Sequence, residues 1–112
     1  MRITEQVDEL GKLTVPTLAK YDYGKDKQAI IDYMINGKLV SASSAKVFNY
    51  IAGCEYDQYC RMSYTDNAYE WNTNDILYIE LYDMAINEDF IKQIIGAKAE
   101  KPVRKTRKKA DF

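Results

Sequence analysis

The sequence predicts a mainly α fold: a small single-domain helical bundle of four to six short helices around a central apolar helix at about residues 75–95, with a basic flexible C-terminal arm. Three observations predict this class. One long segment is apolar enough to be buried on most sides, shorter segments have apolar residues at helical spacing, and the charge changes sign near residue 97. We therefore expect an acidic helical body at residues 1–97 and a basic arm at residues 98–112.

The central helix is predicted by the segment from Asn74 to Ile95, in which thirteen of twenty-two residues are apolar or aromatic. At helical spacing these side chains form two apolar rows and leave a narrow polar stripe, as in a buried helix. The rows are Leu77, Leu81 and Met84 and Ile79, Tyr82 and Ile86, and the stripe is Glu80, Asp83 and Asn87. Thr73 or Asn74 is the expected N-cap. Asn87 precedes two acidic residues like a second N-cap, so the segment can also form two helices with a bend near Asn87.

Two shorter helices are expected before it. Ile3, Val7 and Leu10 follow i, i+4, i+7 spacing and predict a helix that ends near Gly11. Residues 12–16 then form an extended connector, or Pro16 opens a short helical turn.

The segment Lys25–Asn36 has the same helical pattern. Its inward residues are expected to be Ile30, Ile31, Met34 and Ile35. Asn36 and Gly37 are expected to end this helix, because both tolerate the left-handed conformation that a helix C-terminus commonly needs.

A further helix is predicted after Ser41 or Ser43, with Gly53 as its end. Two helices joined by a short turn outline either an ordinary helical hairpin, which we favour, or a helix-turn-helix. In the second case Ser43–Ala52 would be the reading helix. That segment has no Arg for the commonest contact with guanine.

The segment Cys54–Trp71 has no single period. Tyr56, Tyr59 and Cys60 suit a helix. The even spacing of Tyr56, Cys60, Met62 and Tyr64 suits a strand. We favour a helix followed by a loop. Asp, Asn and Thr residues at 65–74 predict turns and a cap before the central helix.

Composition indicates one globular domain of 112 residues in the cytoplasm, or otherwise inside a host cell. Two cysteines are too few for a disulfide framework, and the N-terminus has no apolar run of signal-peptide length. A membrane span is not expected, because Asp75, Glu80 and Asp83 would each cost roughly 2 to 3 kcal/mol or more near the bilayer centre.

Catalysis is not expected either. The chain has no His, which removes the usual general base and the usual partner of a Ser or Cys nucleophile. Asp57, Asp66, Glu70 and Asp75 are carboxylates that could pair, but the fifteen acids of residues 1–97 make pairs inevitable by chance.

No metal site or cofactor is expected. Cys54 and Cys60 are spaced too widely for the short Cys pair of a zinc site, and we expect two partly buried free thiols. The five glycines are scattered and form no phosphate-binding loop.

An acidic, Tyr-rich stretch lies between Glu55 and Asp89, with nine acids and one base, Arg61. Such a surface repels phosphate and suits contact with a basic protein partner. The predicted contact residues are Glu55, Tyr56, Asp57, Tyr59, Tyr64, Asp66, Tyr69 and Trp71. Alternatively the rings fill the core, which we favour for Tyr78 and Tyr82.

The basic arm has seven cations and two acids, a net charge of +5, against nine cations and fifteen acids, a net charge of −6, in residues 1–97. It predicts contact with DNA, RNA or another polyanion, or else a solubilising tail. The cations are Lys98, Lys101, Arg104, Lys105, Arg107, Lys108 and Lys109.

Together these features predict a small non-enzymatic interaction protein, bacterial or phage, with an acidic protein-contact face and a basic arm for nucleic acid or another polyanion. One alternative is a helix-turn-helix DNA-binding regulator. Another is a phage-type acidic inhibitor that occupies a basic groove of a nucleic-acid enzyme.

Overall fold

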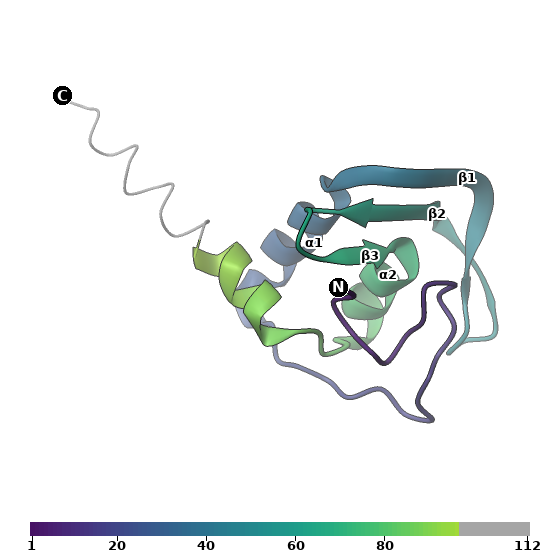
Figure 1. The fold of residues 1–112 in the computed structure, drawn as a ribbon. Helices are drawn as coiled ribbons and strands as arrows, with labels where there is room; N and C mark the ends of the chain where they lie inside the picture. Colours follow the sequence, from purple (N-terminus) through teal and green to yellow (C-terminus); the bar gives the residue numbers. More distant parts are fainter. Residues whose placement is uncertain (97–112) are drawn as a thin grey trace.

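A three-stranded antiparallel sheet and three α-helices make up residues 1–96, the part of the chain that the structure, a computed structural model, describes (Figure 1). The fold is therefore α+β, and the prediction of a mainly α bundle is wrong. The elements are a 3-10 turn η1 (Gly24–Asp26), helix α1 (Lys27–Ile35), strands β1 (Lys38–Asn49), β2 (Cys54–Thr65) and β3 (Glu70–Asn72), helix α2 (Thr73–Tyr82) and a last helix at 88–96.

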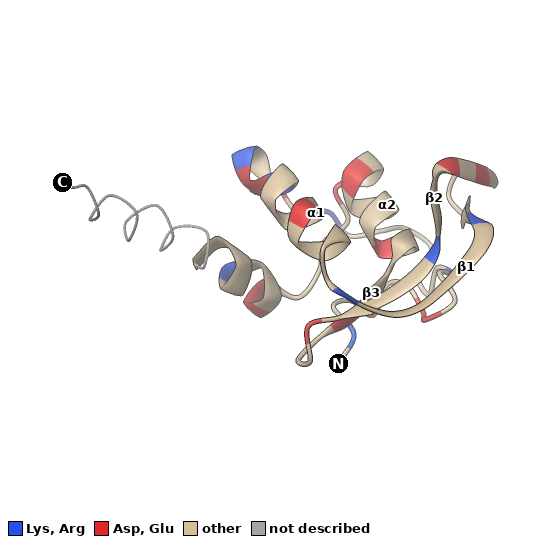
Figure 2. Ribbon diagram, turned by 90° about the horizontal axis from the view of Figure 1, so that it is seen from above, with Lys and Arg blue, Asp and Glu red and all other residues tan. Residues whose placement is uncertain are grey.

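The sheet has the order β1-β2-β3, and its longest part is the β1–β2 hairpin. Lys38 pairs with Thr65 at one end and Asn49 with Cys54 at the other, with three register irregularities between them. The hairpin turn ends at Gly53, whose φ of +77° favours glycine. In Figure 2 the hairpin curves around α2.

The predicted helix after Ser41 is wrong, because residues 43–49 lie in β1 and residues 50–52 in its turn. Val47 and Asn49 are buried while Phe48 between them is exposed, which is the alternation of a strand. Pairing with β2, distant in sequence, overrides the local helical spacing. The proposed reading helix of a helix-turn-helix is therefore absent at Ser43–Ala52.

The favoured helix at the start of Cys54–Trp71 is also wrong, and the strand alternative is confirmed by β2. Tyr64 of β2 is buried and stacks on Trp71, its partner in β3, with ring centroids 6.3 Å apart. Cross-strand aromatic pairs of this kind stabilise a sheet beyond their burial alone.

The N-terminal segment is irregular rather than helical, with isolated β-bridges at Arg2 and Val7. Ile3 donates its N–H to Glu70 O at 3.2 Å and accepts at its carbonyl from Asn87 N–H at 2.6 Å. These partners satisfy the backbone groups that a helix would have used internally. Ile3 and Val7 are buried, as expected of their apolar side chains, but Leu10 is 56% exposed.

Helix α1 is confirmed, with Ile30, Ile31 and Met34 buried, but Ile35, which was also expected to point inward, is 42% exposed. Its expected left-handed end is wrong, because Asn36 has φ −94°. Gly37 is needed for a different reason: a Cβ there would lie 2.5 Å from Trp71 Cζ2. Trp71 therefore packs directly on the α1–β1 connection.

The central segment forms two helices, so the bend near Asn87 is confirmed and a single helix over 75–95 is wrong. Helix α2 ends at Tyr82, and Asp83 takes a left-handed conformation with φ +57°. Asn87 then caps the last helix, since its Oδ1 accepts from Asp89 N at 2.8 Å and Phe90 N at 3.3 Å.

The N-cap of α2 is Asn72 instead of Thr73 or Asn74, and it forms a reciprocal capping box with Asp75. Leu77 and Tyr78 of this helix are fully buried. Leu81 is 45% exposed, so its expected place in the centre of the core is wrong. Among the helices of residues 1–96, none has the length and apolar content that crossing a membrane requires.

Candidate functional site

The structure divides the eight predicted contact residues into two groups at opposite ends of β2. Four lie in its first half, next to the hairpin turn: Glu55, Tyr56, Asp57 and Tyr59. The other four lie at its end, in the turn that follows and in β3: Tyr64, Asp66, Tyr69 and Trp71.

The rings of the second group belong to the core. Trp71 is 1% exposed, and its Nε1 donates to the carbonyl of Met34 at 3.0 Å. Tyr69 packs edge-on against Phe90 at a centroid distance of 5.1 Å. Trp71, Tyr64 and Phe90 are buried, and Tyr69 is partly buried against them. These rings therefore join the sheet to α1 and the last helix.

Asp66 organises the turn between β2 and β3. Its Oδ1 accepts from the backbone N–H groups of Ala68 and Tyr69, and its Oδ2 accepts from the hydroxyl of Tyr33 and from Gln93 Nε2. Partial burial acts to raise the pKa of this carboxyl, but the hydrogen bonds outweigh it and hold the pKa below its ordinary value. With four donors around it, Asp66 has a structural role here.

The first group lies near Glu80 of α2, and we name this set the acidic surface: Glu55, Tyr56, Asp57, Tyr59 and Glu80. Within it Tyr56 and Tyr59 face the core, whereas Glu55 and Asp57 lie on the solvent-facing side of β2. The Tyr59 hydroxyl donates to Glu80 Oε1 at 2.7 Å, and the Tyr56 and Tyr59 rings are 5.6 Å apart. Figure 2 shows acidic segments at the start of β2 and in the C-terminal half of α2 on the same side of the molecule.

Glu80 was expected only as part of a solvent-facing stripe. Its place beside Tyr59 depends on how β2 packs against α2, and residues 21 positions apart in sequence carry no local signal of that contact. The two tyrosines are half-buried against the core, whereas Glu55 and Asp57 are exposed.

The protonation states on the acidic surface follow from burial and from Glu80. Burial, and then the hydrogen bond to the Glu80 carboxylate, raise the pKa of the Tyr59 hydroxyl well above its ordinary value. Burial and the charge of Glu80 also raise the pKa of Tyr56. Both hydroxyls therefore stay protonated at neutral pH, and Tyr59 donates its single hydroxyl proton to Glu80.

One cation lies close to the acidic surface. Lys46 of β1 approaches Asp57 with an N–O distance of 3.4 Å, and the two side chains are 50% and 76% exposed. Ion pairs in this setting contribute little, so Asp57 can exchange Lys46 for a cation of a partner.

Within residues 1–96 no three His, Cys, Asp or Glu side chains come together as a group that could hold a metal ion. Cys54 and Cys60 are free thiols, and both are exposed rather than partly buried as expected.

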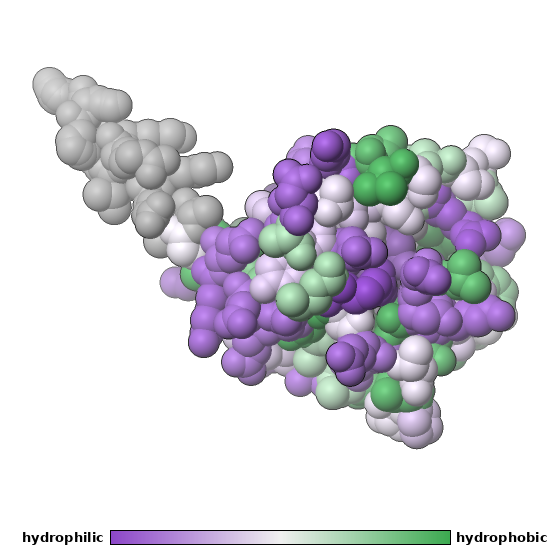
Figure 3. All heavy atoms as spheres, viewed as in Figure 1, coloured by the Kyte–Doolittle hydropathy of each residue, from purple (hydrophilic) through white to green (hydrophobic). Residues whose placement is uncertain are grey.

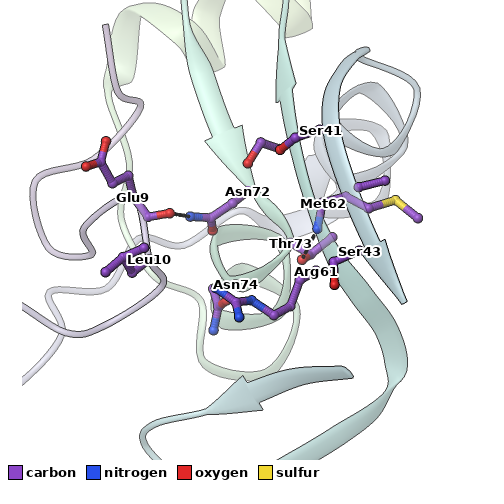
Figure 4. Close-up of a pocket in the computed structure, with 11 residues that line it drawn as sticks. Glu9, Leu10, Ser41, Ser43, Arg61, Met62, Asn72, Thr73 and Asn74 are labelled. Carbon is purple, nitrogen blue, oxygen red and sulfur yellow. Dashed lines mark hydrogen bonds between the residues drawn. The ribbon is translucent and has the colours of Figure 1, made fainter. Parts of the chain in front are cut away.

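A polar pocket of about 260 Å³ lies between the N-terminal loop and the hairpin, above the start of α2 (Figure 4). Glu9 and Arg61 line it together with serines of β1 and β2. Asn72 on its floor already donates to Glu9 O at 3.2 Å and caps α2. The pocket thus contains one acidic and one basic side chain, Glu9 and Arg61, so its charge favours neither an anion nor a cation. The N–H groups at the start of α2 are already capped by Asn72.

The cations of the basic arm lie outside the described residues. Comparison of the chain with protein-family models, with curated proteins and with solved structures found no match.

Proposed function

We propose that the chain is a non-enzymatic interaction protein that binds a basic segment of a protein partner through the acidic surface. The contact between Tyr59 and Glu80 carries the proposal, because it brings two half-buried tyrosines of β2 together with a carboxylate of α2. Tyrosine is enriched at protein interfaces and among the residues that contribute most to binding.

The charges around these rings favour a cationic partner. Glu55 and Asp57 are exposed on the same half of β2, and their charges attract Lys or Arg over a distance of about one Debye length. The same charges repel phosphate, so bases of a nucleic acid are not expected to stack on Tyr56 or Tyr59.

A double charge reversal tests this. The probe is a fluorescein-labelled peptide rich in Lys and Arg, and its affinity is measured at two salt concentrations. Glu55→Lys with Asp57→Lys should weaken binding at least tenfold at low salt and flatten the salt dependence. Equal affinity of the variant and the original chain would contradict the proposal.

The control variant has the same net charge but changes two exposed acids elsewhere, Glu5→Lys on the N-terminal segment and Glu88→Lys on the last helix. It should retain most of the affinity. Equal losses in both double variants would mean that the peptide responds to net charge and not to the acidic surface.

We also propose that the basic arm binds DNA, RNA or another polyanion, on the strength of its seven cations. An acidic inhibitor of a nucleic-acid enzyme is the narrower alternative, in which the acidic surface occupies the partner's basic groove. In that case nucleic acid and this protein would compete for the same partner, which a displacement assay distinguishes.

A further inference from the structure

Strand β1 forms one edge of the sheet, because the strand order is β1-β2-β3 (Figure 1). The opposite edge is short and covered. Strand β3 has three residues, and Glu70 in it accepts from the Ile3 N–H at 3.2 Å and donates its own N–H to the Met1 carbonyl at 2.8 Å. The long edge that can receive another strand is therefore that of β1.

The outer edge of β1 has no neighbouring strand within residues 1–96. Its first nine residues, 38–46, are all exposed. An edge strand presents a row of N–H and C=O groups that no second strand pairs with, and these groups are complementary to those of another extended chain. The edge of β1 therefore fits a partner that is itself a β-strand.

Large apolar side chains lie along the first part of this edge. Leu39 is 52% and Val40 is 63% exposed, and Ile35 at the end of α1 is 42% exposed. Figure 3 shows apolar atoms over the first half of β1. Val40 has no Cα partner in β2, because the register passes from Leu39 to Ser41 across it. A second strand that covered these side chains would add apolar burial to backbone pairing.

The first part of β1 is complementary to its own copy. The strand has two charged residues, Lys38 and Lys46, and no acid. An antiparallel pair with its two-fold axis at Ala42 would place Lys38 against Lys46, which is unfavourable. With the axis at Val40, Lys38 lies opposite the other copy's Ala42, and Lys46 lies beyond the paired segment. Val40 then faces its own copy, and no lysine faces a lysine.

We propose that two copies of the chain pair antiparallel through residues 38–42 of β1, about a two-fold axis at Val40, and join their sheets into one. Both copies use the same edge, so the assembly ends at a dimer. The pairing is independent of the acidic surface, which lies on the first half of β2 and on α2. Because the paired segment is short, we expect a dissociation constant in the micromolar range or weaker.

Sedimentation of the full-length chain over a concentration series tests the pairing. The mean mass should rise from monomer towards dimer, and the amides of residues 39–42 should exchange more slowly at the higher concentrations, whereas those of α2 should not change. Both effects should persist at high salt, because salt screens backbone pairing less than it screens contact between exposed charges. A chain that stays monomeric throughout, or a dimer that high salt dissociates, would overturn the proposal.

Charge substitutions at Val40 locate the interface. Val40→Lys places two lysines against each other across the axis and should raise the dissociation constant of the dimer about tenfold or more, and Val40→Glu should do the same. An equimolar mixture of the two variants should dimerise again, since a lysine then faces a glutamate. This recovery does not depend on a comparison with the original chain, so it separates a lost contact from a damaged fold.

Ile51→Lys is the matched control. Ile51 is also a β-branched residue, 40% exposed, but it lies in the hairpin turn at the far end of β1. This variant should dimerise like the original chain. A dimer that Val40→Lys leaves intact, or that Ile51→Lys weakens equally, would overturn pairing through this edge. A mixture of folded Val40→Lys and Val40→Glu chains that stays monomeric would overturn it as well.

Discussion

Asp75 is a fully buried carboxylate that ties the N-terminus to the start of α2. Its Oδ2 lies 2.9 Å from Arg2 Nη2 and accepts from the Asn72 N–H at 2.9 Å. Burial raises the pKa of Asp75 to about 6, against the opposing effects of the Arg2 charge and the Asn72 N–H. The ion pair therefore links the N-terminal segment to the start of α2, although burial makes the charged form of Asp75 less stable than it would be in water.

This shift predicts how stability depends on pH. The ordinary pKa of 3.8 applies in the unfolded chain, so between about pH 4 and 6 the folded state binds the proton more tightly. Below pH 3.8 the buried Asp75 makes its full contribution to the free energy of unfolding. This contribution is at most about 3 kcal/mol, and it is lost as the pH rises through the folded-state pKa of about 6. Urea unfolding from pH 4 to 7 measures it.

Asp75→Asn removes this titration and serves as the comparison. The free energy of unfolding of the original chain, minus that of the variant, should fall as the pH rises from 4 to 6. A difference that rises instead would show that Arg2 outweighs burial and holds the pKa of Asp75 below its ordinary value.

Leu77 and Leu81 give a matched pair on one helix. Leu77 is fully buried, so Leu77→Ala should leave a cavity and lower the free energy of unfolding by about 2 to 5 kcal/mol. Leu81 is 45% exposed, and Leu81→Ala should cost about 1 kcal/mol or less. Thermal melts of the two variants compare these losses of stability. Similar losses at both positions would mean that α2 does not bury Leu77 and expose Leu81 as described.

At the scale of elements, the predicted segments differ in how much of their structure is determined locally. Helix α1 is amphipathic in its own sequence, and the cap at Asn87 uses local hydrogen bonds, so both leave a recognisable pattern. The first nine residues of β1 are exposed, so no burial period could reveal the strand. Its structure comes from pairing with β2, which is a non-local contact.

The candidate site, too, depends partly on contacts between residues that are distant in sequence. Tyr56, Tyr59, Glu55 and Asp57 could be predicted from composition, because an acidic, Tyr-rich stretch is visible in the sequence. Composition could not separate them from Trp71, whose burial depends on packing against the α1–β1 connection.

Asn87 caps the start of the last helix. Asn87→Ala would leave the N–H groups of Asp89 and Phe90 without their side-chain acceptor, and should cost about 1 kcal/mol of stability. Asn87→Asp keeps an acceptor at this position and should cost much less. Hydrogen exchange of the helix amides at 88–96 reads the effect locally, and unchanged exchange in Asn87→Ala would mean that the cap contributes nothing.

At the scale of the whole molecule, the charge is divided between residues 1–97, with −6, and the basic arm, with +5. The two halves predict opposite partners: cations for the acidic surface and a polyanion for the arm. The described core is formed by residues between Ile3 and Ile94. The fold of the body is therefore expected to persist without the arm.

Deletion of residues 98–112 tests both statements in one variant. Seven cations that each displace a counterion from duplex DNA should give a slope near −6 in a plot of log affinity against log salt, from about 0.9 per phosphate contacted. The deletion should abolish DNA binding and leave the melting temperature nearly unchanged. A clear fall in the melting temperature would show instead that the arm docks on the acidic body, and the acidic surface would then already have a basic ligand in its own chain. Full-length protein that binds neither DNA nor RNA at low salt would remove the polyanion proposal, while the acidic surface and its basic protein partner would be unaffected.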